Sequence, residues 1–516
     1  MLSDSTLSLA SIERQLRSLL PADLYAAAWL EPNSANLMRV FQHLRTLQHI
    51  LNDYTPRQVS ENPPGLGKVR YTWREGTLLF TDLAGFTSLL EANAKYGRQG
   101  AILLLKVLNQ YFSEMIEIVS KSGGDLLEFT GDAMLVQFLA DAQGDDVAQA
   151  VRAGLRMQRT MAAHFANIEM DESQFSLGMR VGIHSGRFLT ADIGTPMRMA
   201  HVLLGRTVQQ AKHVEGAGKV GQVCLTQSQG KLLQDAFHFE PQGTDYLLVQ
   251  DDFTSKQLGE YDITVSRRRQ AGSVLFDRSV NGLLTEITEM VRRVEPLASY
   301  MPKPILKLLV QSAAQRQIPP DFPDSIVLFI NLLGLPESVD DAMPDEVDCI
   351  VTSFSKAFAA INAAVITQGG ILQKVTYQLV GSDILVYFGV LDTHCDSAIR
   401  AANAAIAVRN VVTQLVAPCV DGKPIQVACR MGLTSGAVFA AEIGEPRGRR
   451  EFNILGDPVN TAARLMTRAA PNQILMTGSV YQAIASRFDC DSLGKVALKG
   501  KSAAVDIFAL RDRIED

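Results

Sequence analysis

Two acidic residues, Asp82 and Asp132, each stand where an apolar run meets a glycine-containing turn. Asp82 closes the run 78–81, and Asp132 follows Gly131 at the tip of a predicted β-hairpin. Carboxylates on neighbouring strand ends can share hard divalent cations, which take oxygen ligands and bind beside phosphates. Because Asp is also frequent in turns, either residue alone predicts a turn as readily as a metal site. Their joint placement favours the metal site.

The turn directly after Asp82 is a second candidate site. It consists of Ala84, Gly85, Phe86 and Thr87. Its backbone N–H groups enter a predicted helix, and a helix N-terminus attracts anions. The turn therefore predicts a cradle for a triphosphate. The alternative is a plain tight turn whose amides face water.

The elements that position these residues follow the order strand, helix, two strands, helix, strand. Apolar periodicity and glycine turns predict strand 78–82, helix 100–120, the hairpin that carries Asp132, helix 146–165 and strand 175–184. This βαββαβ order predicts a ferredoxin-like α+β domain with helices on one face of its sheet.

The same order recurs in the second half of the chain. Matching segments are 54–57 and 300–303, 78–82 and 327–331, 123–124 and 369–370, 135–138 and 385–388, 180–186 and 430–436, and 204–205 and 455–456. An internal repeat of this kind predicts two similar domains that pair about a pseudo-two-fold axis, with two equivalent clefts at their interface.

The repeat divides the chain into four predicted parts. They are an N-terminal helical region at 1–72, a first domain at 73–266, a helical connector at 267–320 and a second domain at 321–511. Within the N-terminal region, apolar residues recur at helical spacing over 5–54, with breaks at Pro21 and Pro32.

Composition excludes several classes of partner. The net charge is −6 and the pI about 5.8, so no broad basic field is expected and nucleic acid is a poor candidate. The six cysteines form no C-x-x-C pair, which indicates reduced thiols. We find no uncharged apolar run near the length of a membrane span and no signal-peptide layout, which predicts a cytoplasmic protein without a membrane partner.

Three separated motifs resemble the class III nucleotidyl cyclases. They are segment 80–87, the hairpin tip at Gly131 and Asp132, and the sequence LGDPVNTAAR at 455–464. The tandem arrangement, with both acids only in the first half, is similar to that of the soluble, bicarbonate-responsive adenylyl cyclases and their bacterial relatives. The resemblance spans about residues 73–510. It implies two cyclase homology domains that pair within the chain and convert ATP to 3′,5′-cyclic AMP and pyrophosphate.

The resemblance also implies a metal-binding role for the first half. Asp82, Asp132 and the carbonyl of Leu83 would hold two Mg²⁺ or Mn²⁺ ions, which activate the ribose 3′-hydroxyl and clamp the leaving oxygens. Arg180 matches a triphosphate-binding basic residue, and a plain surface arginine is the alternative.

The second half would supply the groups that stabilise the transition state. Asn460 and Arg464 are four residues apart on a predicted helix and therefore share one face. By resemblance, Asn460 orients the ribose and Arg464 stabilises the charge at the α-phosphate, a task suited to a planar fixed cation. The alternative is a solvated helix face.

Two further residues of the second half match base-contacting positions of the family. Lys374 would donate to adenine N1, and the amide oxygen of Asn453 would accept from the exocyclic amine. Because the Asn453 amide can also turn round and donate, the choice of base stays open at this position.

The opposite cleft lacks these groups. Asn331 and Ser382 replace the two acids, and Gln209 and His213 stand in place of the helical asparagine and arginine. Asp383 is adjacent to Ser382, and a one-residue offset on a strand predicts that its side chain points to the other face. We therefore expect no cyclisation in this cleft.

In the bicarbonate-responsive relatives this second cleft holds the activating anion between a lysine and an arginine. Glu128 and Lys212 stand at the matching positions here. An anionic Glu128 would repel bicarbonate and could pair with Lys212, which predicts cyclase activity that is indifferent to bicarbonate.

Three functions are weighed from the sequence. The first is adenylyl cyclase. The second is guanylyl cyclase, which is supported only by Glu128 because it resembles a guanine-reading residue. The third is a non-catalytic nucleotide or anion sensor, which would be expected to have lost some of the four residues Asp82, Asp132, Asn460 and Arg464, all of which are present.

Overall fold

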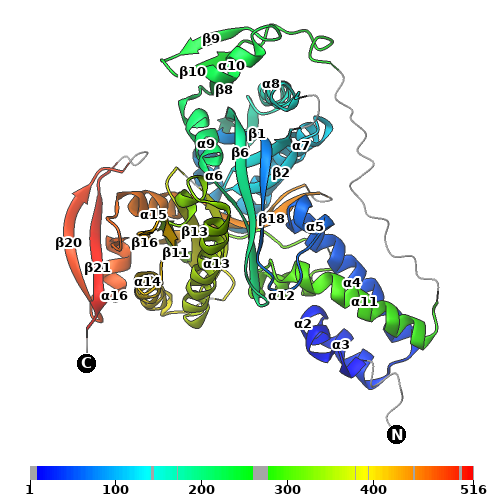
Figure 1. Cartoon of the computed structure of the whole chain (residues 1–516). Helices are drawn as coiled ribbons and strands as arrows, with labels where there is room; N and C mark the ends of the chain where they lie inside the picture. Colours follow the sequence, from blue (N-terminus) through cyan, green and yellow to red (C-terminus); the bar gives the residue numbers. More distant parts are fainter. Residues whose placement is uncertain are drawn as a thin grey trace.

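The computed structural model describes residues 9–140, 144–170, 173–259, 277–315, 317–377, 379–392, 394–445, 448–498 and 503–514. Two α+β halves pack against each other, and a helical arm projects away from them (Figure 1). The first labelled helix, α2, belongs to this arm, and the last labelled strand, β21, lies beside β20 in the second half (Figure 1).

The first half is built on an antiparallel sheet in the order β2-β3-β1-β6. Its strands are β1 (Arg70–Ala84), β2 (Asp125–Thr130), β3 (Ala133–Leu139) and β6 (Gly178–Thr195). Helices α7 (Gly97–Lys121) and α8 (Asp146–His164) share one apolar core with this sheet. This arrangement confirms the predicted ferredoxin-like order.

Further elements extend the first half. Strand β8 (Val223–Thr226) joins β6 in parallel and leads to β10 (Tyr246–Val249) and β9 (Phe239–Gln242). The remaining elements are α6 (Phe86–Ala94), β4 (Ile168–Met170), β5 (Ser173–Phe175), β7 (Arg198–Leu204), α9 (Arg206–Ala217) and α10 (Gln227–Leu233).

The second half repeats the sheet in the order β12-β13-β11-β16, continued by β19, β21 and β20. These strands are β11 (Asp324–Leu333), β12 (Ile371–Tyr377), β13 (Ser382–Phe388), β16 (Ala428–Ala437), β19 (Ile474–Thr477), β20 (Phe488–Val496) and β21 (Val505–Arg513). Two hairpins stand apart, β14 (Cys419–Val420) with β15 (Lys423–Pro424) and β17 (Phe439–Gly444) with β18 (Arg450–Leu455). The helices are η1 (Pro336–Asp340), α13 (Pro344–Thr367), α14 (Ser397–Thr413), α15 (Asp457–Arg468) and α16 (Gly478–Ile484).

The side chains of β1 belong to two apolar cores, because they alternate between the two faces of the sheet. Leu79 and Leu83 belong to the core shared with α7 and α8, whereas Leu78 and Phe80 belong to a core that includes α9 and residues of the second half. Successive side chains of a strand point to opposite faces, so a continuous apolar run is needed where both faces are buried.

Strands β1 and β6 are longer than the sequence predicted. They pair without interruption from Arg70 opposite Asp192 to Ala84 opposite Gly178. The residues 70–77 are half-polar and lack the apolar run that marks the rest of the strand, which is why the pattern predicted only its second part.

In each half, a glycine near the end of a strand forms a hydrogen bond to the long helix of the other half. The Gly194 N–H donates to Ser355 Oγ of α13 at 2.8 Å, and the Gly444 N–H donates to Asn109 Oδ1 of α7 at 3.2 Å. Because each half makes the same contact to the other, the two halves pair with pseudo-two-fold symmetry.

The helical arm joins the N-terminal region to the connector. It contains α2 (Glu13–Leu19), α3 (Ala22–Leu30), α4 (Ser34–Tyr54), α5 (Arg57–Glu61), α11 (Val280–Ala298) and α12 (Lys303–Gln311). Helices α4 and α11 lie side by side (Figure 1). Tyr54, at the end of α4, donates to Glu442 of the second half at 2.8 Å, so the N-terminal part of the arm is bonded to the second half. Part of the predicted connector, 267–276, lies outside the described residues.

Among the described helices, α13 has the length and apolar composition that crossing a membrane would need, and such a feature is also typical of a core helix. Half of its most apolar window is buried inside the protein, where Val351, Phe354 and Phe358 pack in the core of the second half.

Candidate active site

The structure brings Asp82 and Asp132 to the same edge of the first sheet. Asp82 lies near the end of β1, and Asp132 lies in the turn between β2 and β3. Strands β1 and β3 pair up to Thr81 opposite Met134, so the two acids flank the end of this pairing. Burial, together with the negative charge of Asp82, raises the pKa of Asp132 to about 7.

This donor set fits a hard divalent cation. Two neighbouring carboxylates repel each other when both are ionised, and a cation bound between them offsets this repulsion. Leu83, the predicted carbonyl ligand, is buried and follows Asp82 on β1. The described chain holds no cluster of three or more His, Cys, Asp or Glu side chains suited to a metal. Water and substrate oxygens would therefore complete the coordination, as is usual for Mg²⁺.

Arg180 takes part in the acid site directly. It stands opposite Asp82 in the β1–β6 register, and its guanidinium forms an ion pair with the Asp82 carboxylate. Its Nε also lies 3.0 Å from Oε1 of Glu215, whose other oxygen lies 3.0 Å from Nζ of Lys212. Arg180 is therefore paired with two acidic side chains, and Glu215 is a neighbour of the candidate site that sequence spacing did not indicate.

The predicted anion turn has the backbone geometry of a helix start. Ala84 ends β1, Gly85 has a φ of +88° and α6 begins at Phe86. A Cβ at Gly85 would lie 2.4 Å from the main-chain oxygen of Ser176, so both conformation and space require glycine. The N–H groups of Phe86 and Thr87 are in the first turn of α6, where they have no partner within the helix.

Asn460 and Arg464 lie on α15 of the second half, one turn apart on the same face. Asn460 is exposed and Arg464 is half-buried. Neither side chain has a hydrogen bond or an ion pair to any of the residues that the structure describes. Both are therefore available to a substrate.

Contacts between the halves bring α15 to the metal-binding edge. A Cβ at Gly131, in the turn that carries the second acid, would lie 3.7 Å from Cδ2 of Leu455. A Cβ at Gly456, which precedes α15, would lie 3.8 Å from Cδ2 of Leu90 on α6. The start of α15 thus lies beside both the hairpin tip and the helix of the anion turn.

The two predicted base-contacting residues lie on neighbouring elements of the second half. Lys374 on β12 bridges the halves, because its Nζ donates to the main-chain oxygen of Phe129 at 2.5 Å and lies 2.9 Å from Oε1 of Glu451. Asn453 is buried on β18, and its Oδ1 accepts from the Ile454 N–H at 3.0 Å. Its Nδ2 is buried without a partner in the described structure, which leaves a donor for a ligand.

Glu451 is a further residue of this region that the sequence analysis missed. It precedes Asn453 by two positions on β18, so the two side chains share one face of the strand. That spacing was a usable signal once Asn453 had been chosen. Its importance comes from Lys374, whose ammonium it neutralises.

The predicted pair of Glu128 and Lys212 is wrong. Lys212 binds Glu215 and lies over the ring of Phe80, 4.2 Å from its centroid. Glu128 is buried, and burial raises its pKa to about 8 against the opposing effect of the nearby Lys374. Burial therefore favours the neutral form of Glu128, which weakens the repulsion of an anion by its charge.

The opposite cleft carries a different arrangement at the matching strand ends. Asn331 donates to Oδ1 of Asp383 at 2.8 Å and to the main-chain oxygen of Val380 at 2.7 Å. Arg430 donates to Oδ1 of Asn331 at 2.7 Å. The prediction that Asp383 points away is wrong, because β11 and β13 pair Asn331 directly opposite Asp383 and cross-strand partners share a face.

Protein groups also bridge the opposite cleft. Oδ2 of Asp340 accepts from the Arg206 N–H at the start of α9 at 2.6 Å. Gln209, at the position equivalent to Asn460, donates to the main-chain oxygen of Leu379. In this cleft, the N–H at the start of α9 and the side chain of Gln209 are therefore already bonded to the second half.

A sequence model of the adenylate and guanylate cyclase catalytic domain matches residues 70–258 and 326–511. The two matches cover most of the chain and coincide with the two halves of the structure, so the chain belongs to this family. The resemblance drawn from the three motifs is confirmed.

Similar curated proteins are adenylate cyclases. Adenylate cyclase type 10 of Mus musculus is 21% identical over 412 residues, covering 76% of this chain and 24% of that protein. The same protein of Oryctolagus cuniculus is 22% identical over 451 residues, covering 83% and 25%. An adenylate cyclase of Mycobacterium tuberculosis is 28% identical over 207 residues, covering 40% and 43%. The chain thus spans about a quarter of the length of the type 10 relatives.

A solved structure shares the tandem fold. The crystal structure of a class III adenylyl cyclase-like ATP-binding protein from Pseudomonas aeruginosa aligns with a TM-score of 0.54 at 14% identity, covering 86% of this chain and 92% of that one. The alignment extends over more of the chain than the two catalytic domains, so the fold that includes the paired halves is shared.

Proposed function

We propose that the chain is an adenylyl cyclase that converts ATP to 3′,5′-cyclic AMP and pyrophosphate in one of its two clefts. The observation that carries this proposal is the apposition of Asp82 and Asp132 from the first half with the helix that bears Asn460 and Arg464 from the second. These contacts support a site that takes its groups from both halves.

Each residue has a role in this proposal that follows from its chemistry. Two divalent cations, Mg²⁺ or Mn²⁺, held by Asp82 and Asp132 with the Leu83 carbonyl, would lower the pKa of the 3′-hydroxyl and offset charge on the leaving pyrophosphate. Asn460 holds the ribose so that its 3′-oxygen faces the α-phosphorus. Arg464 donates to the α-phosphate oxygens, where negative charge increases in the transition state.

The triphosphate is held by the first half. The N–H groups of 84–87 bind its oxygens at the start of α6. Arg180 is ion-paired with Asp82 in the structure, and a cation at Asp82 would compete for that carboxylate. The planar guanidinium of Arg180 would then bind phosphate oxygens, to which it can donate two parallel hydrogen bonds.

Lys374 and Asn453 are proposed to read adenine, with Lys374 donating to N1. A second candidate is GTP, because Asn453 presents an unpartnered Nδ2 and Glu451 supplies an acceptor beside Lys374. Guanine needs a donor for O6 and an acceptor for its N1–H and N2–H₂ groups. Glu128, which first suggested this alternative, is buried, and burial favours its neutral form, so Glu451 is the better guanine-reading candidate.

A third candidate is ATP binding without cyclisation. Two observations favour it, the ion pair that occupies Asp82 and the ion pair that occupies Lys374. The Pseudomonas aeruginosa protein with the same tandem fold is described as cyclase-like and ATP-binding.

One experiment separates the three candidates. Purified full-length protein is incubated with ATP or GTP and with Mg²⁺ or Mn²⁺, and the products are identified by chromatography and mass spectrometry. We expect cyclic AMP and pyrophosphate from ATP in a one-to-one ratio. Cyclic GTP as the main product supports the second candidate, and nucleotide recovered unchanged despite binding supports the third.

A matched pair of variants assigns the reaction to one cleft. Asp82→Asn removes a metal-binding carboxylate and should abolish turnover, whereas Asn331→Ala alters the equivalent position of the opposite cleft and should leave it. Equal activity of Asp82→Asn and the unmodified protein would contradict the assignment.

A further inference from the structure

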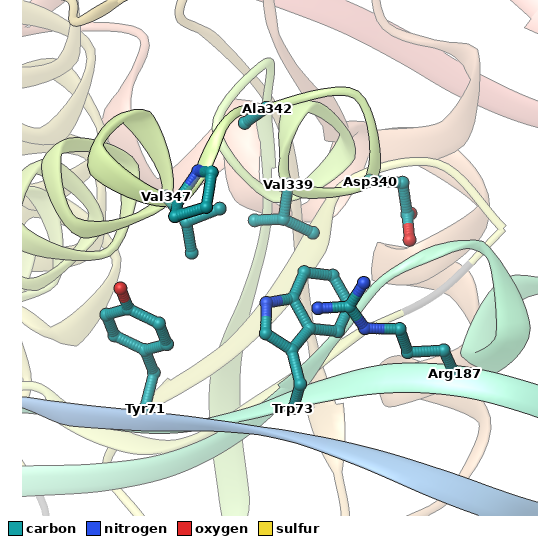
Figure 2. A pocket seen from close by; sticks show the side chains of 8 residues that line it. Tyr71, Trp73, Arg187, Val339, Asp340, Ala342 and Val347 are labelled. Carbon is teal, nitrogen blue, oxygen red and sulfur yellow. The ribbon is translucent and has the colours of Figure 1, made fainter.

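A cavity separate from both strand-end sites lies between the two halves (Figure 2). Its volume is about 280 Å³. The first half contributes Tyr71 and Trp73 from β1 and Arg187 from β6. The second half contributes Val339 from η1, Ala342 from the turn that follows η1, and Val347 from α13. The cavity shares no residue with the candidate active site.

The aromatic wall offers hydrogen-bond donors that the protein does not use. Neither the Trp73 indole N–H nor the Tyr71 hydroxyl has a partner within the described chain. Figure 2 shows the indole nitrogen on the side of the ring that faces Tyr71, with Val339 and Val347 opposite. The gap between the two rings is therefore apolar on one side and lined by donors on the other.

Arg187 supplies a cation at the mouth of the cavity. Its guanidinium lies 3.9 Å from the centroid of the Trp73 ring, and it forms no ion pair with any described residue. Asp340 also lines the cavity: its Oδ2 accepts from the Arg206 N–H, and burial raises the pKa of its carboxyl group against the opposing charges of Arg206 and Arg187. A guanidinium stacked on an aromatic face keeps its N–H groups in its own plane, so its fork is free for a carboxylate.

We propose that this cavity is a binding site for a small planar organic anion, an aromatic carboxylate of one or two rings. The ring lies between Tyr71 and Trp73 against the valines, and the carboxylate takes the fork of Arg187. The volume falls just below the roughly 300–1,000 Å³ of pockets for drug-sized ligands, which matches a ligand of this size. A cationic ligand is disfavoured because Arg187 stands at the same mouth.

Because the walls come from both halves, an occupied cavity ties the halves together. A ligand that binds only the assembled protein stabilises it by mass action. The unfolding temperature should therefore rise with ligand concentration, whatever nucleotide the active cleft takes. This inference does not rest on the proposed function.

Tryptophan fluorescence provides a direct test, because the chain has two tryptophans, Trp29 and Trp73. In a Trp29→Phe background, Trp73 is the only indole reporter. Benzoate is the probe, and benzamide is its uncharged isostere. We expect saturable quenching by benzoate and about tenfold weaker binding of benzamide, as loss of one charge-assisted hydrogen bond predicts.

Variants of two arginines locate the site. Arg187→Gln should weaken benzoate binding about tenfold, for the same reason. Arg152→Gln is the matched control, because Arg152 also lies over an aromatic ring, Phe237, at 5.8 Å, but outside the cavity. Ala342→Leu fills the cavity and should abolish binding of both probes.

Three results would overturn the proposal. They are quenching that rises linearly without saturation, equal binding of benzoate and benzamide, and benzoate binding that is unchanged by Arg187→Gln and Ala342→Leu. Isothermal titration calorimetry of the same variants provides a readout that does not depend on Trp73 emission.

Discussion

The two clefts of this molecule are made from equivalent strands and helices, yet their strand ends meet different electrostatic demands. In the first cleft, Asp82 and Asp132 crowd each other, and the pKa of Asp132 rises to about 7. In the second, Asn331 donates to Asp383, so a neutral amide satisfies the acid. Burial also raises the pKa of Asp383 to about 7, so the clefts differ in whether a second carboxylate or an amide stands beside the buried acid.

The helices that face these strand ends differ in the same way. Asn460 and Arg464 of α15 have no partner in the part of the chain that the structure describes, whereas Gln209 of α9 is bonded to Leu379. Asp340 further occupies the N-terminus of α9. In the opposite cleft, the groups at the equivalent positions are therefore bonded within the protein.

The largest effect is expected from a substitution on α15, and the equivalent position of α9 provides its control. Arg464→Ala should lower kcat by about 10²–10³-fold, because it removes a preorganised donor to the charge of the transition state. The KM for the nucleotide should change much less. Steady-state rates of cyclic nucleotide formation measure both parameters.

The matched variant of the opposite helix is His213→Ala. It should leave kcat within experimental error of the unmodified protein. A comparable loss in both variants would show that the two clefts do not differ in the way described.

A smaller effect concerns the base. Lys374→Ala should lower the ratio of kcat/KM for ATP to that for GTP by about tenfold, as expected for one lost hydrogen bond from a charged donor. Glu451→Gln is the companion variant, since it keeps the lysine but removes its ion pair. A ratio that stays constant in Lys374→Ala would remove this residue from base recognition.

A further test uses the contribution of Glu128 to the pH dependence of stability. Its folded-state pKa of about 8 exceeds the ordinary value of 4.5, so between these values the unfolded state binds fewer protons and stability falls as pH rises. Glu128→Gln should remove this slope and stabilise the protein at pH 9 relative to pH 5. Chemical denaturation at both pH values measures the effect.

Glu240→Gln is the control for this experiment, because Glu240 is exposed on β9. It should shift stability equally at the two pH values. A pH slope that is the same in Glu128→Gln as in the unmodified protein would contradict the burial argument.

Much of the fold and part of the site could be predicted from the sequence. The repeat and the glycine turns gave the two ferredoxin-like halves, because apolar alternation and turn chemistry are local properties. Asp82, Asp132 and Gly85 could be chosen because each ends or follows a strand. The positions of Asn460 and Arg464 came from helical spacing and from the family resemblance.

Contacts between segments distant in the sequence could not be predicted in the same way. Glu215 meets Arg180 only because α9 packs on the sheet beside β6. Lys212 binds Glu215, three residues ahead on its own helix, in preference to Glu128. The direction of the Asp383 side chain follows from the register between β11 and β13, which the residues of its own strand do not encode. Such contacts depend on three-dimensional packing, which spacing along one element does not encode.

The last prediction is that bicarbonate has no effect on the rate. Bicarbonate should not change the rate of the cyclase, because Lys212 is held by Glu215 and Glu128 replaces the second basic residue. Rates at constant pH and ionic strength, with chloride as the control anion, test this prediction. Clear stimulation by bicarbonate would show that the second cleft still binds the anion.

The number of nucleotides bound per chain tests the central claim most directly. Calorimetric titration with 3′-deoxy-ATP, which cannot cyclise, in the presence of Mg²⁺ counts the sites without turnover. We predict one site per chain, weakened by Lys374→Ala and unaffected by His213→Ala. Two equivalent sites per chain, or one site weakened by His213→Ala alone, would contradict the division into one substrate-binding cleft and one closed cleft.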